Sequence, residues 1–179
     1  MAEEAVRAVT MSDAAPLRGE KRWAYLARQL SIRLATTNED GSIYLSTLWF
    51  VIEDQKMYLV IDAAGRHSEN LRAGRPMAAL VDDGNEFATV AGVRIIGSAA
   101  AVEGDPEHSE RLEGLLRDKY WFKGHPFEEA ATLFGRFAGR TYFEVIPDKM
   151  IGWDTRETTT PQVTEVHDLP DFVVDRRIS

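Results

Sequence analysis

Tyr58-Leu-Val-Ile-Asp62, followed directly by Ala63-Ala-Gly-Arg-His-Ser-Glu-Asn-Leu-Arg72, is the central segment of this 179-residue chain. Its apolar, branched start is typical of a buried β-strand, and the small residues around Gly65 predict a turn that opens a short helix. The first N–H groups of a helix have no partner inside it and attract anions. Three side chains at this turn are suited to contact a phosphate: Arg66, His67 and Ser68. The segment therefore predicts an anion site, although a strand, a glycine turn and a polar helix also occur in many domains without a ligand.

The residues before this segment predict a meander of three antiparallel strands. Residues 31–37 alternate between polar and apolar types, and Asn38-Glu-Asp-Gly41 supplies turn residues. Residues 42–52 are too apolar for a strand that faces water on one side, and residues 53–56 turn the chain into the strand at 57–61. These three strands are therefore expected to lie side by side in one sheet.

Further elements are expected on both sides of the meander. Helix signals cover residues 19–30, 69–74, 107–120 and 128–137, and strand signals cover residues 77–81, 90–102, 139–146 and 150–153. The first helix is expected to bury one stripe formed by Trp23, Leu26, Ala27 and Leu30. Gly97 indicates a kink or bulge within its strand, and the strand at 150–153 is expected to be the return of the one at 139–146.

About six strands joined mostly by short turns predict a mainly β fold, an antiparallel barrel with helices at its ends. A Rossmann domain is disfavoured because the elements do not alternate as β-α-β and no Gly-x-Gly-x-x-Gly run occurs. The expected organisation is a loose N-terminal arm at 1–18, one barrel domain at 19–155 and an extended tail at 156–179.

Composition excludes several classes of function. The chain has no cysteine, which removes disulfides, thiolate metal sites and cysteine nucleophiles. Its net charge of −8 disfavours a broad surface for nucleic acid or anionic lipid. No apolar run is long enough to span a membrane, so a soluble cytoplasmic protein is expected. The histidines do not form a His-x-x-x-His pair, and no metal site is predicted.

Six segments, in this order and spacing, resemble the split β-barrel flavin and deazaflavin oxidoreductases, a superfamily that includes the pyridoxamine 5′-phosphate oxidases. The segments are Leu34-Ala-Thr-Thr37, Asp40-Gly-Ser42, Leu45-Ser-Thr-Leu-Trp-Phe50, Gly65-Arg-His-Ser-Glu-Asn-Leu-Arg72, Gly92-Val-Arg-Ile-Ile-Gly97 and Ile151-Gly-Trp153. The resemblance spans roughly residues 20–155. It implies a six-stranded split barrel, a homodimer, and two cofactors, FMN or coenzyme F420, at the subunit interface.

The resemblance also implies roles for individual residues. A basic residue, commonly lysine, holds the cofactor phosphate in relatives, and His67 stands at that position here. A nearby phosphate would favour the cationic form of His67, and Arg66 is the alternative source of positive charge. Asn70 either contacts the ligand or braces the short helix. The remaining expected cofactor contacts are Thr36 and Thr37, through their backbone groups, and Ser46, Thr47, Trp49, Ser68 and Trp153. Trp49 and Trp153 are equally well explained as packing residues.

By this resemblance the chain is expected to be an oxidoreductase that transfers hydride to or from a small organic substrate. Because the cofactor carries the hydride, no catalytic side chain is assigned. A true pyridoxamine-phosphate oxidase is disfavoured because the C-terminal region lacks an Arg-x-His pair. The alternative is a barrel that binds flavin or haem without turnover, and His67 is the candidate axial ligand for haem.

Overall fold

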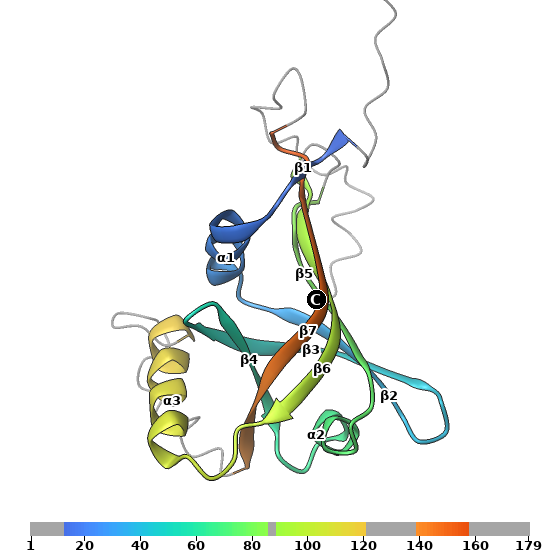
Figure 1. The fold of residues 1–179 in the computed structure, drawn as a ribbon, viewed down its shortest axis with the longest axis vertical. Coiled ribbons are helices and arrows are strands. Elements are labelled where there is room, and N and C mark those ends of the chain that lie inside the picture. The colour runs from blue at the N-terminus through green and yellow to red at the C-terminus, as the bar shows by residue number, and fades with distance from the viewer. Residues whose placement is uncertain (1–12, 86–88, 121–138, 158–179) are drawn as a thin grey trace, which may run out of the picture.

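Six antiparallel strands close into a barrel in this computed structural model, which describes residues 13–85, 89–120 and 139–157 (Figure 1). Around the barrel the strand order is β7-β4-β3-β2-β5-β6, and β6 pairs again with β7 to close the ring, while β1 lies outside against β7. The strands are β1 (Ala15–Pro16), β2 (Ile32–Thr37), β3 (Ile43–Glu53), β4 (Lys56–Asp62), β5 (Met77–Asp83), β6 (Ala91–Ala101) and β7 (Arg140–Asp154). The helices are α1 (Gly19–Arg28), α2 (Arg66–Arg72) and α3 (Pro106–Tyr120). The predicted mainly β fold with a split barrel is confirmed.

The predicted meander forms β2, β3 and β4, each antiparallel to the next. A two-residue turn at Asp54 and Gln55 joins β3 to β4, with φ values of 49° and 60° that suit the right-handed twist of a hairpin. Along β2 every second residue is buried, so Ile32, Leu34 and Thr36 point into the barrel. Thr36 is thereby carried to the interior at the end of β2.

Strand β7 corrects the expectation for the C-terminal part of the barrel. The predicted strand at 139–146 and its return at 150–153 are one continuous strand, Arg140–Asp154. Asp148 is an extra residue between the pairs Ile96–Lys149 and Gly97–Pro147, which makes a β-bulge. A Cβ at Gly97 would overlap the carbonyl oxygen of Ile146, so the predicted irregularity at Gly97 is confirmed. Pro147 and Asp148 resemble a turn in the sequence, but they lie at the bulge, and the chain continues in the same direction.

Helix α1 covers one end of the barrel and differs from its predicted stripe. Leu26 is fully buried and Trp23 packs against the core, as expected, but Tyr25 is buried and Ala27 is exposed. The helix ends at Arg28 because Gln29 adopts an extended backbone, and Leu30 is 60% exposed beyond it. The hydroxyl of Tyr25 donates to the carbonyl of Ala91 at 2.9 Å, which fastens α1 to β6.

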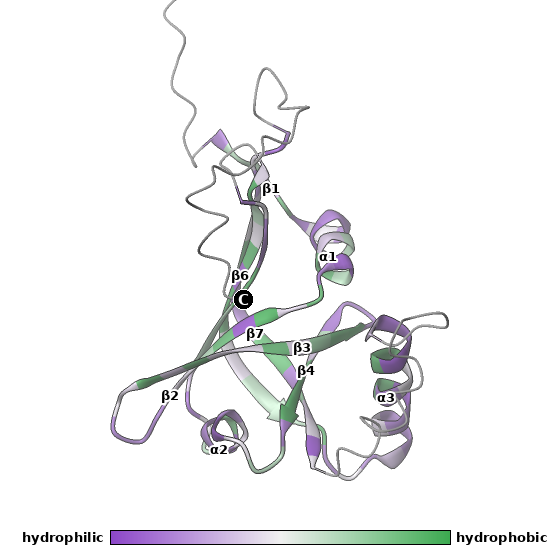
Figure 2. Cartoon of the chain, turned by 180° about the vertical axis from the view of Figure 1, so that it is seen from behind, coloured by the Kyte–Doolittle hydropathy of each residue, from purple (hydrophilic) through white to green (hydrophobic). Residues whose placement is uncertain are grey.

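Helix α3 lies outside the barrel against β3 and β4, as Figure 2 shows from the reverse side. Its residues Leu112 and Leu116 are fully buried in a second, smaller core with residues of β3, β4 and β7. Burying a leucine side chain contributes about 1.5–3 kcal/mol each, which explains why this helix stays on the sheet. The helix predicted at 107–120 is confirmed.

Some expectations fall partly or wholly outside the described residues. These are the helix at 128–137, most of the N-terminal arm (1–12) and the tail from 158 onward. Within the predicted arm, Ala15 and Pro16 form β1, which pairs with Asp154 and Trp153 of β7. No helix in the described part of the chain is long and apolar enough to cross a membrane.

Candidate functional site

Helix α2 follows β4 through a turn organised by Asp62. The N–H of Ala64 donates to the Asp62 carboxylate at 3.0 Å, and the N–H of Gly65 donates to the Asp62 carbonyl at 2.9 Å. A Cβ at Gly65 would lie 3.1 Å from that same carbonyl oxygen, which makes glycine the residue that fits without displacement. The hydroxyl of Ser68 also donates to this carbonyl, at 2.6 Å, and is fully buried. Ser68 therefore lies beneath the turn and braces it, rather than facing solvent.

His67 points into the end of the barrel and is only 3% exposed. Its Nδ1 lies 3.0 Å from Thr36 Oγ1 and its Nε2 lies 2.8 Å from Ser46 Oγ, so both ring nitrogens are hydrogen-bonded. The ring of Tyr44 packs against it with centroids 4.6 Å apart. Burial lowers the pKa of His67 to about 4, which leaves it neutral at pH 7. A cationic His67 that grips phosphate directly does not fit this arrangement.

Asn70 extends the same cluster from the next turn of α2 and is fully buried. Its Nδ2 donates to Thr36 Oγ1 and to Asn38 Oδ1, both at 2.9 Å, and Arg75 Nη1 donates to its Oδ1 at 2.6 Å. Four predicted site residues thus meet in one hydrogen-bonded group: Thr36, Ser46, His67 and Asn70. Together with Asn38 and Arg75 they form what we call the α2 network.

Three members of this neighbourhood escaped the sequence reasoning. Asn38 was expected only as a turn residue, and Arg75 stands between Gly74 and Pro76, which signalled only the end of a helix. Tyr44, which packs on His67, appeared only as one apolar residue of a strand. A sequence signal was available for Tyr44. The two-residue alternation along β2 and β3 places Tyr44 opposite Thr36, on the same face of the sheet.

Arg66 is the exposed cation at the start of α2. It pairs with Glu69 at 3.5 Å, and the two side chains are 56% and 62% exposed. Such a pair contributes only about 0–1 kcal/mol, so it leaves the Arg66 guanidinium free to turn toward an anion. This is the residue at the predicted phosphate site that presents positive charge to solvent.

The remaining predicted residues of β2 and β3 lie on the opposite face of the sheet from the α2 network. Side chains alternate along a strand, so Thr47 and Trp49 face outward where Ser46 faces inward, and Thr37 does so beside Thr36. The indole of Trp49 stacks on Tyr120 of α3, with centroids 4.9 Å apart. The structure thus places the predicted side-chain contacts of β3 on two faces, while the expected backbone contacts of Thr36 and Thr37 stay a prediction.

Trp153 lies near the end of β7, away from α2, where it pairs with Pro16 of β1 (Figure 1). Its indole covers Gly92 of β6, and a Cβ at position 92 would lie 2.6 Å from Trp153 Cζ2. Within one chain Trp153 is therefore a packing residue, separated from the α2 network. Its expected contact with a cofactor across a subunit interface stays a prediction.

The outward face of the barrel carries a row of apolar side chains beside this site. The row crosses four paired strands and consists of Leu45, Ala35, Ala78 and Ile96. Leu45 is 63% exposed and Ile96 is 41% exposed. Ile43 and Trp49, also exposed, extend the apolar surface along β3. Contiguous exposed apolar surface is typical of an interaction site.

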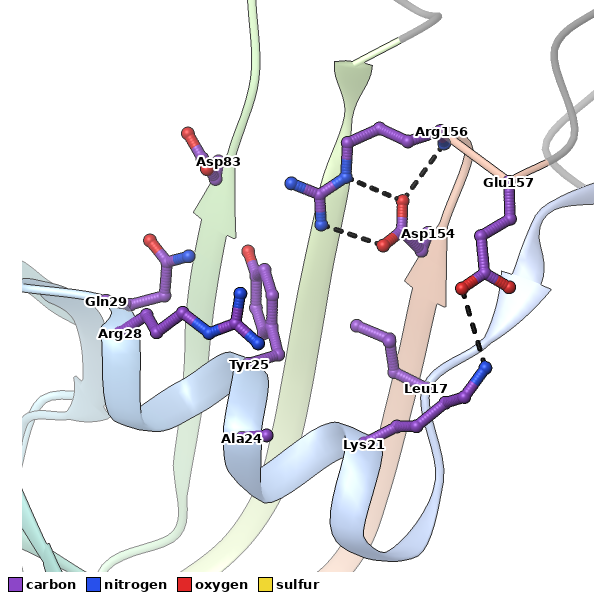
Figure 3. A pocket seen from close by; sticks show the side chains of 10 residues that line it. All are labelled: Leu17, Lys21, Ala24, Tyr25, Arg28, Gln29, Asp83, Asp154, Arg156 and Glu157. Atoms are coloured by element: carbon purple, nitrogen blue, oxygen red, sulfur yellow. Dashed lines mark hydrogen bonds and ion pairs between the residues drawn. The ribbon is translucent and has the colours of Figure 1, made fainter.

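A cavity of about 480 Å³ lies elsewhere, between α1 and the ends of the strands next to it (Figure 3). Several of its charged groups pair with one another. Arg156 makes two hydrogen bonds to the carboxylate of Asp154, at 2.7 and 2.8 Å, and Lys21 lies 3.5 Å from Glu157. The Arg156–Asp154 pair fixes the segment after β7 on its own strand, and the exposed Lys21–Glu157 contact links that segment to α1. The charged groups that line the cavity are therefore largely paired with one another.

Comparisons with known proteins agree with this fold. Residues 20–153 match the family model described as pyridoxamine 5′-phosphate oxidase. A comparison with curated proteins gave no match.

Among solved structures, the conserved hypothetical protein Rv2991 from Mycobacterium tuberculosis aligns with a TM-score of 0.72 and 22% identity, covering 89% of this chain and 98% of that one. The haem storage protein HutZ from Vibrio cholerae aligns with a TM-score of 0.60 and 16% identity, over 79% of this chain and 99% of that one. An FAD-binding protein from Mesorhizobium loti aligns with a TM-score of 0.56 and 19% identity, over 78% and 94%. At these identities the likeness shows the shared fold.

Proposed function

Because this chain belongs to the pyridoxamine 5′-phosphate oxidase family, we propose that it binds FMN or coenzyme F420 beside α2 and transfers hydride to or from a small organic substrate. The observation that carries this proposal is the buried α2 network, which fixes Ser46 and Thr36 under a surface where Arg66 supplies a cation. Preorganised hydrogen-bonding groups beside a positive charge suit a phosphate-bearing aromatic ligand.

The residues present fit such a cofactor. Arg66 would hold the phosphate through its exposed guanidinium. Ser46 would hydrogen-bond to an edge of the ring, and the exposed ring of Tyr44, on the same face of β3, would offer apolar surface against it. The bound ring supplies the hydride chemistry, so the chain's own task is to bind it, orient it and keep water away.

We propose that a second copy of this chain covers the outward face of the barrel. The apolar row from Leu45 to Ile96 is exposed in a single chain, and burying apolar surface contributes about 25 cal/mol per Å². Arg33, in the neighbouring row, forms an ion pair with Asp82, two residues beyond its strand partner Leu80, which gives this face a polar border. A homodimer would close the open side of the cofactor site and exclude water from the ring.

Haem binding through His67 fits the geometry poorly. Both ring nitrogens are hydrogen-bonded and the ring is buried, so an iron bond would require breaking the contact to Thr36 or Ser46. His108, the other histidine in the described part of the chain, lies in the first turn of α3, where its Nε2 is 2.9 Å from Glu53 Oε2. A flavin-binding barrel without turnover shares the proposed site and differs only in the absence of a reaction.

The test is a titration of purified apo-protein with FMN, F420, FAD and haem, followed by absorbance and fluorescence. We expect one of FMN and F420 to bind with one molecule per chain. The bound cofactor is then reduced under anaerobic conditions and mixed with quinones and activated alkenes. Oxidation faster than that of free reduced cofactor supports the enzyme, and an unchanged rate supports the non-catalytic alternative. Failure of both FMN and F420 to bind refutes the proposal.

A further inference from the structure

The donor and the acceptor of each hydrogen bond in the α2 network can be assigned. The assignment starts from the charged groups at one end of the network. Arg75 has only donors, so its 2.6 Å contact fixes the oxygen of the Asn70 amide toward Arg75. The two ends of an amide are similar in shape, and partners of this kind decide its orientation. The NH2 group of Asn70 must then face Thr36 and Asn38.

A second charged group at the turn between β2 and β3 gives the same orientation independently. Two hydrogen bonds from Ser42 lower the pKa of Asp40, so this carboxylate is ionised and only accepts. The hydroxyl proton of Ser42 is used on Asp40, and Ser42 Oγ therefore accepts from Asn38 Nδ2 at 3.0 Å. This turns Asn38 Oδ1 toward Asn70 Nδ2, which again must donate. Arg75 and Asp40, from different loops, thus agree.

The next two hydrogen bonds follow from Thr36, which is 1% exposed. Its oxygen accepts from Asn70, and its single proton needs an acceptor within reach. Among its contacts in the described residues, His67 Nδ1 at 3.0 Å is the group able to accept. A neutral imidazole that accepts at Nδ1 carries its proton on Nε2, and that proton is donated to Ser46 Oγ at 2.8 Å.

We propose that Arg75 and Asp40 impose a one-way chain of hydrogen bonds, Asn70 to Thr36 to His67 to Ser46, that leaves the Ser46 hydroxyl as a donor toward the ligand. Ser46 already accepts from His67, so its own proton is available to the half-exposed side of β3. The site therefore selects a carbonyl oxygen or an unprotonated ring nitrogen at this position and disfavours an N–H group there. With the opposite tautomer of His67, Ser46 would use its proton on the imidazole and offer only lone pairs.

Arg75 and Asp40 are positioning residues in this scheme, since Arg75 acts on the ligand through four intervening side chains and Asp40 through six. The identity of the ligand rests on the proposed function, but the direction of the chain does not. The tautomer of His67 is a property of the protein alone, which allows the two to be tested separately.

The decisive measurement is the tautomer of His67 in ¹⁵N-labelled apo-protein near neutral pH, from long-range ¹H–¹⁵N correlations. The His67→Gln spectrum assigns the signal by its loss. We expect the form protonated at Nε2, and the form protonated at Nδ1 would overturn the proposal.

Two matched double variants test the anchors. Asp40→Asn with Arg75→Lys keeps a donor beside Asn70 and is expected to keep the wild-type tautomer. Asp40→Asn with Arg75→Glu places an acceptor there and is expected to move signal toward the Nδ1 form. If the second variant is folded and keeps the wild-type pattern, the anchors do not set the direction. If the second variant does not fold, the tautomer of His67 in the wild type still tests the proposed direction of the chain.

Ser46→Ala then tests the last step with FMN and F420 as probes. For whichever cofactor binds the wild type, we expect affinity to fall about fivefold or more, as for a lost hydrogen bond. An unchanged affinity would overturn the donor role of Ser46. If neither cofactor binds the wild type, the proposed function fails, while the tautomer result stands.

Discussion

His67 Nε2 and Ser46 Oγ lie 2.8 Å apart and join helix α2 to strand β3 across the end of the barrel. The contact holds the imidazole below the surface, where it supports the site from beneath. A histidine at the start of a helix after a glycine turn would ordinarily be expected to face solvent. Here its burial has consequences that can be measured by pH.

Stability should fall in mild acid because of His67. Burial lowers its pKa from 6.5 to about 4, so the unfolded chain takes up a proton between these values and the folded chain does not. The free energy of unfolding should therefore decrease as pH falls from about 6.5 to about 4, at up to about 1.4 kcal/mol per pH unit from this group. Urea unfolding at pH 7.5, 6.0 and 5.0 measures the slope.

His67→Gln is the control for that experiment, because it keeps a neutral polar side chain and removes the titrating group. The variant is expected to be less stable at pH 7.5 but to lose less stability on acidification. Equal slopes in wild type and variant would show that His67 does not titrate as described.

Arg66→Ala should weaken binding of the phosphate-bearing cofactor by about 1–3 kcal/mol, as expected for a lost charge-assisted contact. Glu69→Gln removes the exposed partner of Arg66 and leaves the guanidinium in place, so affinity should be kept or slightly raised. Fluorescence titration of the three proteins compares them. If Arg66→Ala binds as well as wild type, Arg66 does not hold the phosphate.

Leu45→Glu should dissociate the proposed homodimer, since it places a charge at the β3 end of the apolar row, between the exposed side chains of Ile43 and Trp49. Leu30→Glu is a matched control, because Leu30 has nearly the same exposure, 60% against 63%, but lies between α1 and β2 outside that row. Sedimentation velocity over a concentration series distinguishes them. A monomeric wild type, or a dimer unaffected by Leu45→Glu, would reject this face as the interface.

Gly92→Ala should destabilise the fold by about 1–3 kcal/mol, because the new methyl group meets the indole of Trp153 at 2.6 Å. The same substitution in a Trp153→Ala background should cost less, since the clashing ring is gone. A double-mutant cycle of unfolding free energies gives the coupling. Additive effects would mean that Trp153 does not pack on Gly92 in solution.

The meander was predictable because its signals are local. The alternation in residues 31–37 and the turn residues after Thr37 specify β2 and its hairpin without reference to other parts of the chain. The continuity of strand β7 was not predictable, because Pro147 and Asp148 resemble a turn. The pairing that keeps the strand continuous comes from β6, which is 50 residues away at the Gly97–Pro147 pair. Tertiary pairing overrode the local pattern.

The same distinction applies to the candidate site. The resemblance to a family brought Thr36, Ser46, His67 and Asn70 together in advance, and the structure joins them. The part played by Arg75 depends on which way an amide in α2 points, and no sequence pattern carries that information.

Strand β7 also determines when the barrel can form during synthesis. It pairs with β4 on one side and β6 on the other. Neither strand has this partner until Arg140–Asp154 has been translated. Until then the nascent chain exposes two unpaired strand edges, which readily pair with other chains. A translation product that stops before Arg140 therefore has every residue of the α2 network and still lacks a closed sheet. We therefore expect chaperones and proteases to recognise such a product before it reaches the native fold.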